Sequence, residues 1–226
     1  MPEKIFVRND DEVSTFLTSS IKNSLKSRNF SVFGEVFNAE NMTECDRRIL
    51  YRSYSTEEDQ KTSLEQRWQV ENIKKKWIVF LSSLPHVKLL EENVIVSDAN
   101  FQLTGTIDGI FKIGEKPVVV DIVNITHKEY EDLEKNGPTR KNIVKIMLKM
   151  WMSEIKHSIL VYEDNDNGKF KVFHITPFKP IVDSVCSKCA KNLQYKIHGK
   201  LPDRMYISKD CAECNVCEFN QRCWKG

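Results

Sequence analysis

The stretch GTIDGIFKIGEKPVVVDIV, residues 105–123, places two aspartates inside apolar segments with the composition of β-strands. Asp108 interrupts TGTIDGI, Asp121 interrupts VVVDIV, and a Gly-containing turn separates the two segments. A buried carboxylate is costly without a partner, which is often a divalent cation. We expect adjacent strands whose aspartates share one hard cation, with Glu92, or its neighbour Glu91, as a third ligand. The alternative is that Asp108 is only a turn residue before Gly109.

The pattern around this stretch predicts a single α/β domain. Helical periodicity runs from about residue 45 to Leu84, where Pro85 ends it, and short β-branched segments follow. A helix is expected from about residue 139 to 156, then two further strands and a C-terminal helix. The expected fold is a mixed β-sheet flanked by helices. Within one domain, residues 1–226, we distinguish an extension (1–40), a helical part (41–84), the sheet core (85–180) and a Cys-rich tail (181–226).

Composition narrows the class of protein. The 226 residues carry 34 Lys and Arg against 32 Asp and Glu, a net charge of +2, which excludes a histone-like binder but allows a local basic face. No apolar run approaches the roughly 18 residues of a membrane-spanning helix, and the N-terminus lacks the apolar core of a signal peptide. We therefore expect an intracellular, cytoplasmic protein without a membrane partner, whose cysteines bind metal rather than form disulfides.

The two aspartates and the order of elements resemble the core of the PD-(D/E)XK nucleases, and more closely their RecB-type branch, which includes small CRISPR-associated exonucleases and phage or viral relatives. In that family the two acids hold Mg²⁺ or Mn²⁺, which activates a water for phosphodiester hydrolysis, and a lysine positions the water. Asp108 and Asp121 match the two acids. The resemblance covers most of the chain from about Asn41.

Four polar positions of the family pattern differ. Val123 stands where the family has its lysine, Met147 and Trp151 occupy the positions matched to a Gln-x3-Tyr pattern, and the helix before the sheet lacks the family's histidine. We interpret these departures as impaired or lost catalysis, with the fold kept as a nucleic-acid- or protein-binding module of DNA metabolism. One alternative is an active exonuclease or endonuclease whose lysine has moved to Lys128, Lys141, Lys145 or Lys149. Another is a scaffold in a replication, recombination or transcription complex.

The cysteines are unevenly placed, with one near the N-terminal end and six in the tail. Cys45, together with Cys214, Cys217 and Cys223, resembles the [4Fe-4S] staple of the same RecB-type branch, in which one N-terminal and three C-terminal cysteines hold the cluster. Such a cluster would close the domain as a long-range crosslink does. The alternative is a zinc site built from two short pairs, which are Cys186 with Cys189 and Cys211 with Cys214.

Basic residues suggest where nucleic acid would bind. Lys141, Lys145 and Lys149 repeat every four residues on the helix that borders the DNA groove in RecB-type folds, so we expect phosphate contacts there, with Lys145 the candidate for a catalytic role. A solvated helix face is the alternative, and we prefer it for the run Lys74 to Lys76. The expected partner is DNA, single-stranded, or a nucleic-acid-processing protein complex.

Overall fold

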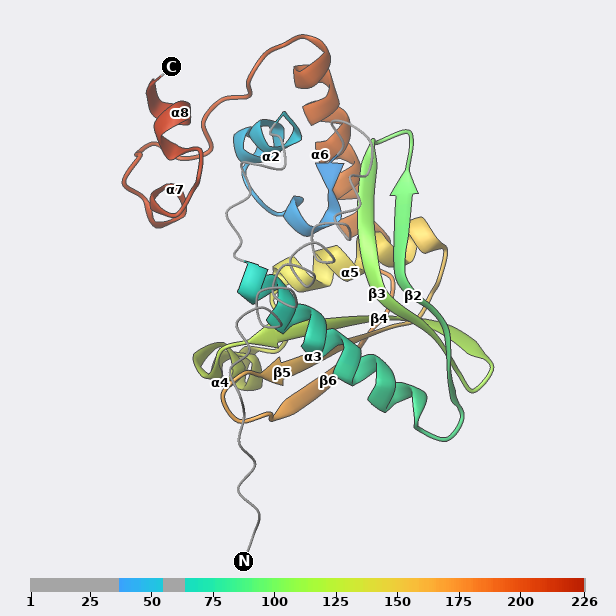
Figure 1. Cartoon of the computed structure of the whole chain (residues 1–226). Coiled ribbons are helices and arrows are strands. Elements are labelled where there is room, and N and C mark those ends of the chain that lie inside the picture. Colours follow the sequence, from blue (N-terminus) through green and yellow to red (C-terminus); the bar gives the residue numbers. More distant parts are fainter. Residues whose placement is uncertain (1–36, 55–63, 226) are drawn as a thin grey trace, which may run out of the picture.

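The computed structural model describes residues 37–54 and 64–225, which form a mixed sheet with helices on both faces (Figure 1). The strands are β1 (Phe37–Asn38), β2 (Val87–Asp98), β3 (Leu103–Ile113), β4 (Lys116–Ile125), β5 (Ser158–Asp164) and β6 (Phe170–Ile175). The helices are the 3-10 turn η1 (Ala39–Asn41), α2 (Asp46–Ser53), α3 (Leu64–Ser82), α4 (His127–Asn136), α5 (Arg140–Ser153), α6 (Lys179–Ile197), α7 (Ala212–Asn215) and α8 (Asn220–Lys225).

The expected α/β architecture is confirmed, including adjacent strands for the two aspartates. Strand order is β1-β3-β4-β5-β6, and β2 also pairs with β3. β3 and β4 are antiparallel neighbours, whereas β4 and β5 run parallel because the chain crosses through α4 and α5 between them. The extension predicted for residues 1–40 ends in β1, which pairs with β3 and is thus part of the sheet.

Strand β3 has two different partners along one of its edges. β2 pairs along the whole of β3, from Leu103 to Ile113, and so occupies one edge. On the other edge β1 pairs with Leu103 and Thr104, while β4 pairs only from Gly109 onward. Residues 105–108 therefore face a gap between β1 and β4, which we call the fork. Asp108 lies at the fork, where its side chain can meet groups other than a neighbouring strand.

Apolar side chains hold helices against both faces of the sheet. On one face, α5 buries Ile146 and Met150 against Ile107 and Val119. On the other, α3 buries Trp77 and Ile78 against β-strand residues that include Phe111 and Val120. Trp68, on the preceding turns of α3, is half exposed and so lies outside this core.

Local signals explain where the crossover helices begin and end. Thr126 and Glu129 form a capping box at the start of α4, a helix that the sequence pattern had not indicated. Thr139 caps α5 by accepting a hydrogen bond from the Asn142 amide, and Glu154 ends α5 in the left-handed conformation. α5 therefore starts beside Gly137 and Pro138 and crosses the sheet at the fork.

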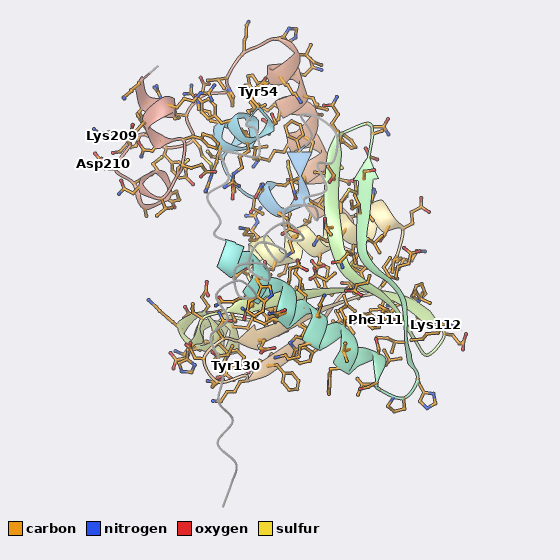
Figure 2. The ribbon with its side chains drawn as sticks, in the orientation of Figure 1. Tyr54, Phe111, Lys112, Tyr130, Lys209 and Asp210 are labelled. Carbon is orange, nitrogen blue, oxygen red and sulfur yellow. The ribbon has the colours of Figure 1, made fainter. Side chains whose placement is uncertain are left out.

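The C-terminal residues form a separate lobe beyond α2. Figures 1 and 2 show α7 and α8, with Lys209 and Asp210 in the preceding loop, far from Phe111 in the sheet. We call residues 208–225 the C-terminal lobe. Among the described residues, no helix is long and apolar enough to cross a membrane.

Candidate active site

Asp108 sits at the fork and is engaged through both carboxylate oxygens. Its Oδ2 accepts a hydrogen bond from the backbone N–H of Ile122 at 2.8 Å, so the side chain takes the place of a strand partner for β4. Its Oδ1 pairs with Lys74 Nζ, from α3, at 2.6 Å. The carboxylate is almost fully buried, at 5% exposure. Asp108 thus joins β3, β4 and α3 at one point.

Asp121 is fully buried one strand away and faces α5. Its Oδ2 accepts a hydrogen bond from Lys149 Nζ at 2.6 Å, and Lys145 Nζ lies 3.6 Å from the same oxygen. Its Oδ1 is buried and has no hydrogen-bond partner among the described residues. A buried carboxylate oxygen without a donor is costly, and a bound cation is one way to satisfy it.

A third carboxylate, Glu40, enters the site from η1 directly after β1. Its Oε1 lies 2.9 Å from Lys149 Nζ and its Oε2 lies 3.1 Å from Lys145 Nζ. Sequence reasoning missed Glu40, because the two-residue strand that positions it gives almost no periodic signal. The one clue in the sequence was that Glu40 lies shortly before Cys45. This clue was too weak to distinguish Glu40 from the other acidic residues.

Lys145 and Lys149 reach the carboxylates because they lie one turn apart on α5. Lys149 is 2% exposed, an unusual burial for a lysine. A Cβ atom on Gly105 would lie 3.5 Å from Lys149 Cγ and 3.2 Å from Ala39 Cβ, so glycine leaves room where Lys149 passes β3. The side chains that α5 directs at Asp121 are therefore these lysines rather than Met147 and Trp151.

The lysines lower the pKa of each carboxylate, but the net direction of the shift differs among the three groups. Burial would raise the pKa of Asp121, but Lys149 and Lys145 outweigh it and hold that pKa below its usual range. The pKa of Glu40 is lowered against burial by the same two lysines. For Asp108, burial and the neighbouring Asp121 raise the pKa, and Lys74 offsets this only in part. Asp108 is thus the carboxyl group that most readily accepts a proton.

The remaining predicted site residues lie in several environments. Glu92 pairs in register with Gly109 but is exposed, and its side chain accepts a hydrogen bond from the Asn93 amide at 3.3 Å. Val123 packs against the apolar cluster of α4 and α5, and Lys141 is exposed one turn before Lys145. Outside this predicted set, His127 at the start of α4 pairs with Asp164 at 2.7 Å.

The expected solvated helix face is wrong for Lys74, which is half-buried, whereas Lys75 and Lys76 are exposed. Lys74 pairs with Asp108, as described above, and so belongs to the candidate site. Lys76 pairs with Glu163, which also accepts a hydrogen bond from the Trp77 indole. The sequence did place the helix of Lys74 directly before the sheet. A helix in that position could pack over the strand that carries Asp108, and this was the available signal for Lys74.

The donor set fits a divalent cation that prefers oxygen ligands. Glu40, Asp108 and Asp121 supply carboxylates, the ligands that suit Mg²⁺ and Mn²⁺, and Asp121 Oδ1 lacks a donor. Each carboxylate is nevertheless engaged by a lysine, and over the ranges 37–54 and 64–225 no three His, Cys, Asp or Glu side chains are already gathered around an ion position. A cation would have to displace at least one of these lysine contacts.

The cysteines of the predicted staple lie where α2 meets the C-terminal lobe, although in the described ranges no three of them are already arranged around a metal position. Cys45 begins α2, and its Sγ accepts the Arg48 backbone N–H at 3.4 Å. Burial raises the pKa of the Cys45 thiol, and the nearby Cys217 and Cys223 add to this. Cys211 and Cys217 also contribute to the raised pKa of Cys214, after burial. The chain therefore brings Cys45 close to residues more than 170 positions later.

Charged side chains fasten the lobe to α2. Glu218 pairs with Arg48 at 2.6 Å and with Arg52 at 2.6 Å, and both arginines also pair with Glu44. Arg47 donates to the carbonyl of Pro202 at 2.7 Å and approaches Cys223 Sγ at 3.6 Å. We call the group of Glu44, Arg48, Arg52 and Glu218 the arginine clasp.

The pair of cysteines on α6 has a different setting. Cys189 is completely buried and lies 4.0 Å from the sulfur of Met42, and burial raises its pKa to about 12. Cys186 is partly exposed on the same helix. Cys189 therefore behaves as a core side chain between α6 and the segment that leads into α2.

Comparison with known proteins identifies the fold. The sequence matches no family model and no curated protein. Among solved structures, SSO0001 has a TM-score of 0.63 at 16% identity, over 92% of this chain and 94% of that one. The alkaline exonuclease LHK-Exo of Laribacter hongkongensis has a TM-score of 0.56 at 13% identity, over 73% and 89%. Its complex with dAMP gives 0.54 at 14% identity, with the same coverage. The chain thus shares the fold of SSO0001 and of this alkaline exonuclease.

Proposed function

We propose that the chain is a metal-dependent nuclease of DNA metabolism whose catalytic lysine comes from helix α5. The observation that carries the proposal is the environment of Asp121, with Lys149 at 2.6 Å from one oxygen and no donor for the other. The resemblance to the nuclease family requires a lysine beside the second acid, Asp121. Val123 stands at the usual position of that lysine and cannot replace it. The exonuclease-like fold supports the same function.

Each residue of the site has a proposed task. Asp108, Asp121 and Glu40 would hold Mg²⁺ or Mn²⁺, which when bound lowers the pKa of a water and polarises the phosphodiester. Lys149 and Lys145 orient Asp121 and Glu40, and Lys145, at 13% exposure, is the better placed of the two to reach a substrate phosphate. We keep Lys141, Lys145 and Lys149 as the proposed phosphate contacts, with Lys141 on the outer turn of α5.

A nuclease assay tests this proposal. Labelled single- and double-stranded DNA is incubated with the anaerobically purified chain and Mn²⁺, beside the variants Asp121→Asn and Lys149→Met. We expect cleavage by the parent chain, a loss of at least about a hundredfold in both variants, and no change in Lys156→Met at the exposed end of the crossover. An uncut substrate with the parent chain would overturn the proposal.

A second candidate function is a catalytically silent binding module, and the pairing of charges favours it. Lys74, Lys145 and Lys149 face Asp108, Asp121 and Glu40, so the described site is neutral without a metal. Such a chain would bind DNA, single-stranded by preference, or a protein of a replication, recombination or transcription complex. Fluorescence anisotropy of labelled DNA across a salt series, with Lys141→Met as the variant, would then show binding without cleavage and a shallower salt dependence in the variant.

We further propose a [4Fe-4S] cluster between α2 and the C-terminal lobe, held by Cys45, Cys214, Cys217 and Cys223. The proximity of Cys45 to Cys217 and Cys223 supports it, and so does Trp224, whose side chain hydrogen-bonds Cys214 and opposes the rise in the pKa of that thiol. A brown protein with about four irons per chain is expected. A colourless protein with one zinc would favour the alternative site of Cys186, Cys189, Cys211 and Cys214.

A further inference from the structure

Lys74 differs from the other two lysines of the site in where it comes from and how it is held. Lys145 and Lys149 both project from α5, are nearly buried, and each contacts both Glu40 and Asp121. Lys74 projects from α3 on the other side of the fork and is 27% exposed. Among the described residues, Lys74 forms an ion pair with Asp108 alone.

The contact of Lys74 lies on the oxygen that a metal would need. Asp108 Oδ2 is committed to the Ile122 N–H at 2.8 Å, a bond that holds β4 at the fork. The ammonium of Lys74 occupies Oδ1 at 2.6 Å. A cation that ligates Asp108 through Oδ1 must therefore displace Lys74 or lie close to its positive charge. Either requirement lowers the affinity of the site for the cation.

We infer that Lys74 competes with the divalent cation for Asp108 and so sets the metal affinity of the site. This inference rests on the proposed function, because it assumes that the carboxylates bind metal. Lys145 and Lys149 keep Glu40 and Asp121 in place. Lys74 can turn toward solvent, and the one buried partner it would lose among the described residues is Asp108. Lys74 is a positioning residue in this scheme, since it acts on the metal through Asp108.

Direct metal binding separates this role from a purely structural one. Mn²⁺ alone is titrated into the full chain by calorimetry, with free Mn²⁺ measured by electron paramagnetic resonance. We expect Lys74→Met to bind Mn²⁺ at least about tenfold more tightly than the parent chain, because a neighbouring positive charge has been removed. Lys74→Arg keeps the charge and should bind as weakly as the parent. Lys75→Met, on the exposed neighbouring position, should leave the affinity unchanged.

Cleavage provides a second readout. In Lys74→Met the Mn²⁺ concentration for half-maximal cleavage should fall by the same factor, while circular dichroism confirms that the variant is folded. Equal Mn²⁺ affinity in Lys74→Met and the parent chain, with cleavage retained, would overturn the inference and leave the proposed function intact. No Mn²⁺ binding by any of the four proteins would overturn both.

Discussion

The carboxylate site at the fork and the cysteine lobe are built in opposite ways. At the fork, Asp108 and Asp121 are held by neighbouring strands of the central sheet, and the lysine partners of Asp121 lie in the protein interior. In the lobe, Cys45 meets Cys217 and Cys223 through short helices fastened by partly exposed ion pairs of the arginine clasp. The first site is part of the folding core, whereas the second depends on contacts that solvent weakens.

This contrast predicts how each region responds to a single substitution. Removing one charge at the fork leaves its partner buried and unpaired, so stability falls together with activity. Removing one charge in the lobe costs little by itself, because water can replace the lost partner. A metal group bound by the cysteines would then contribute most of what holds the lobe. Four predictions follow from this difference, in order of decreasing effect.

Lys149→Met should give the largest loss of stability. It leaves Asp121 buried with only the more distant Lys145, and breaking a buried ion pair costs about 3–5 kcal/mol of unfolding free energy. Urea denaturation measures the change, with Lys141→Met on the exposed turn as the matched control. Because the cost comes from an unpaired charge, the double variant Asp121→Asn with Lys149→Met should recover part of it. No recovery would mean that packing of the lysine stem dominates.

Cys45→Ser should remove one ligand of the proposed [4Fe-4S] cluster and so loosen the C-terminal lobe. We expect bound iron to fall from about four atoms per chain to less than one, and trypsin to cut between α6 and α7 more quickly. Cys186→Ser, on α6, is the control and should keep its iron. Equal iron in Cys45→Ser and the parent chain would remove Cys45 from the ligand set.

Glu218→Gln should have a smaller effect, because it removes two partly exposed ion pairs of the arginine clasp. We expect a loss of about 1 kcal/mol or less in the free energy that holds the lobe closed, seen as modestly faster proteolysis. Glu213→Gln, an exposed acid of α7, is the comparison variant. High salt should erase the difference between the two variants, since it screens surface pairs.

The smallest effect concerns His127 and pH. Its hydrogen bond to Asp164 raises the His127 pKa above the usual value of 6.5. A raised histidine pKa gives stability that is fully present below the unfolded pKa and is lost as pH rises through the folded one. The melting temperature should therefore drop slightly as pH increases above about 6.5, and His127→Gln should flatten that profile. A profile unchanged by the substitution would show that other groups cause the drop.

The sequence was informative wherever a regular element carried the signal. The sequence showed the apolar strands interrupted by Asp108 and Asp121, because apolar residues in strands follow a recognisable pattern. It also showed the lysine repeat of α5, because residues four apart lie on one face of a helix. Glu40 was invisible because a two-residue strand positions it, and Lys74 was misjudged because its role depends on how α3 crosses the sheet. Helix α4 was missed because only Tyr130 and Leu133 of its ten residues are buried. These are long-range placements that one-dimensional patterns do not contain.

The hydrogen bond from the Ile122 backbone N–H to Asp108 gives this aspartate a structural role that does not depend on catalysis. A chain that no longer cut DNA would still need an acceptor at position 108 to keep β4 joined to the fork. Asp108 therefore has a role in folding whether or not the site is catalytic, and its presence alone says little about activity. Asp121 is more informative, because its Oδ1 makes no hydrogen bond among the described residues. A chain without catalytic activity would have no structural need for that oxygen.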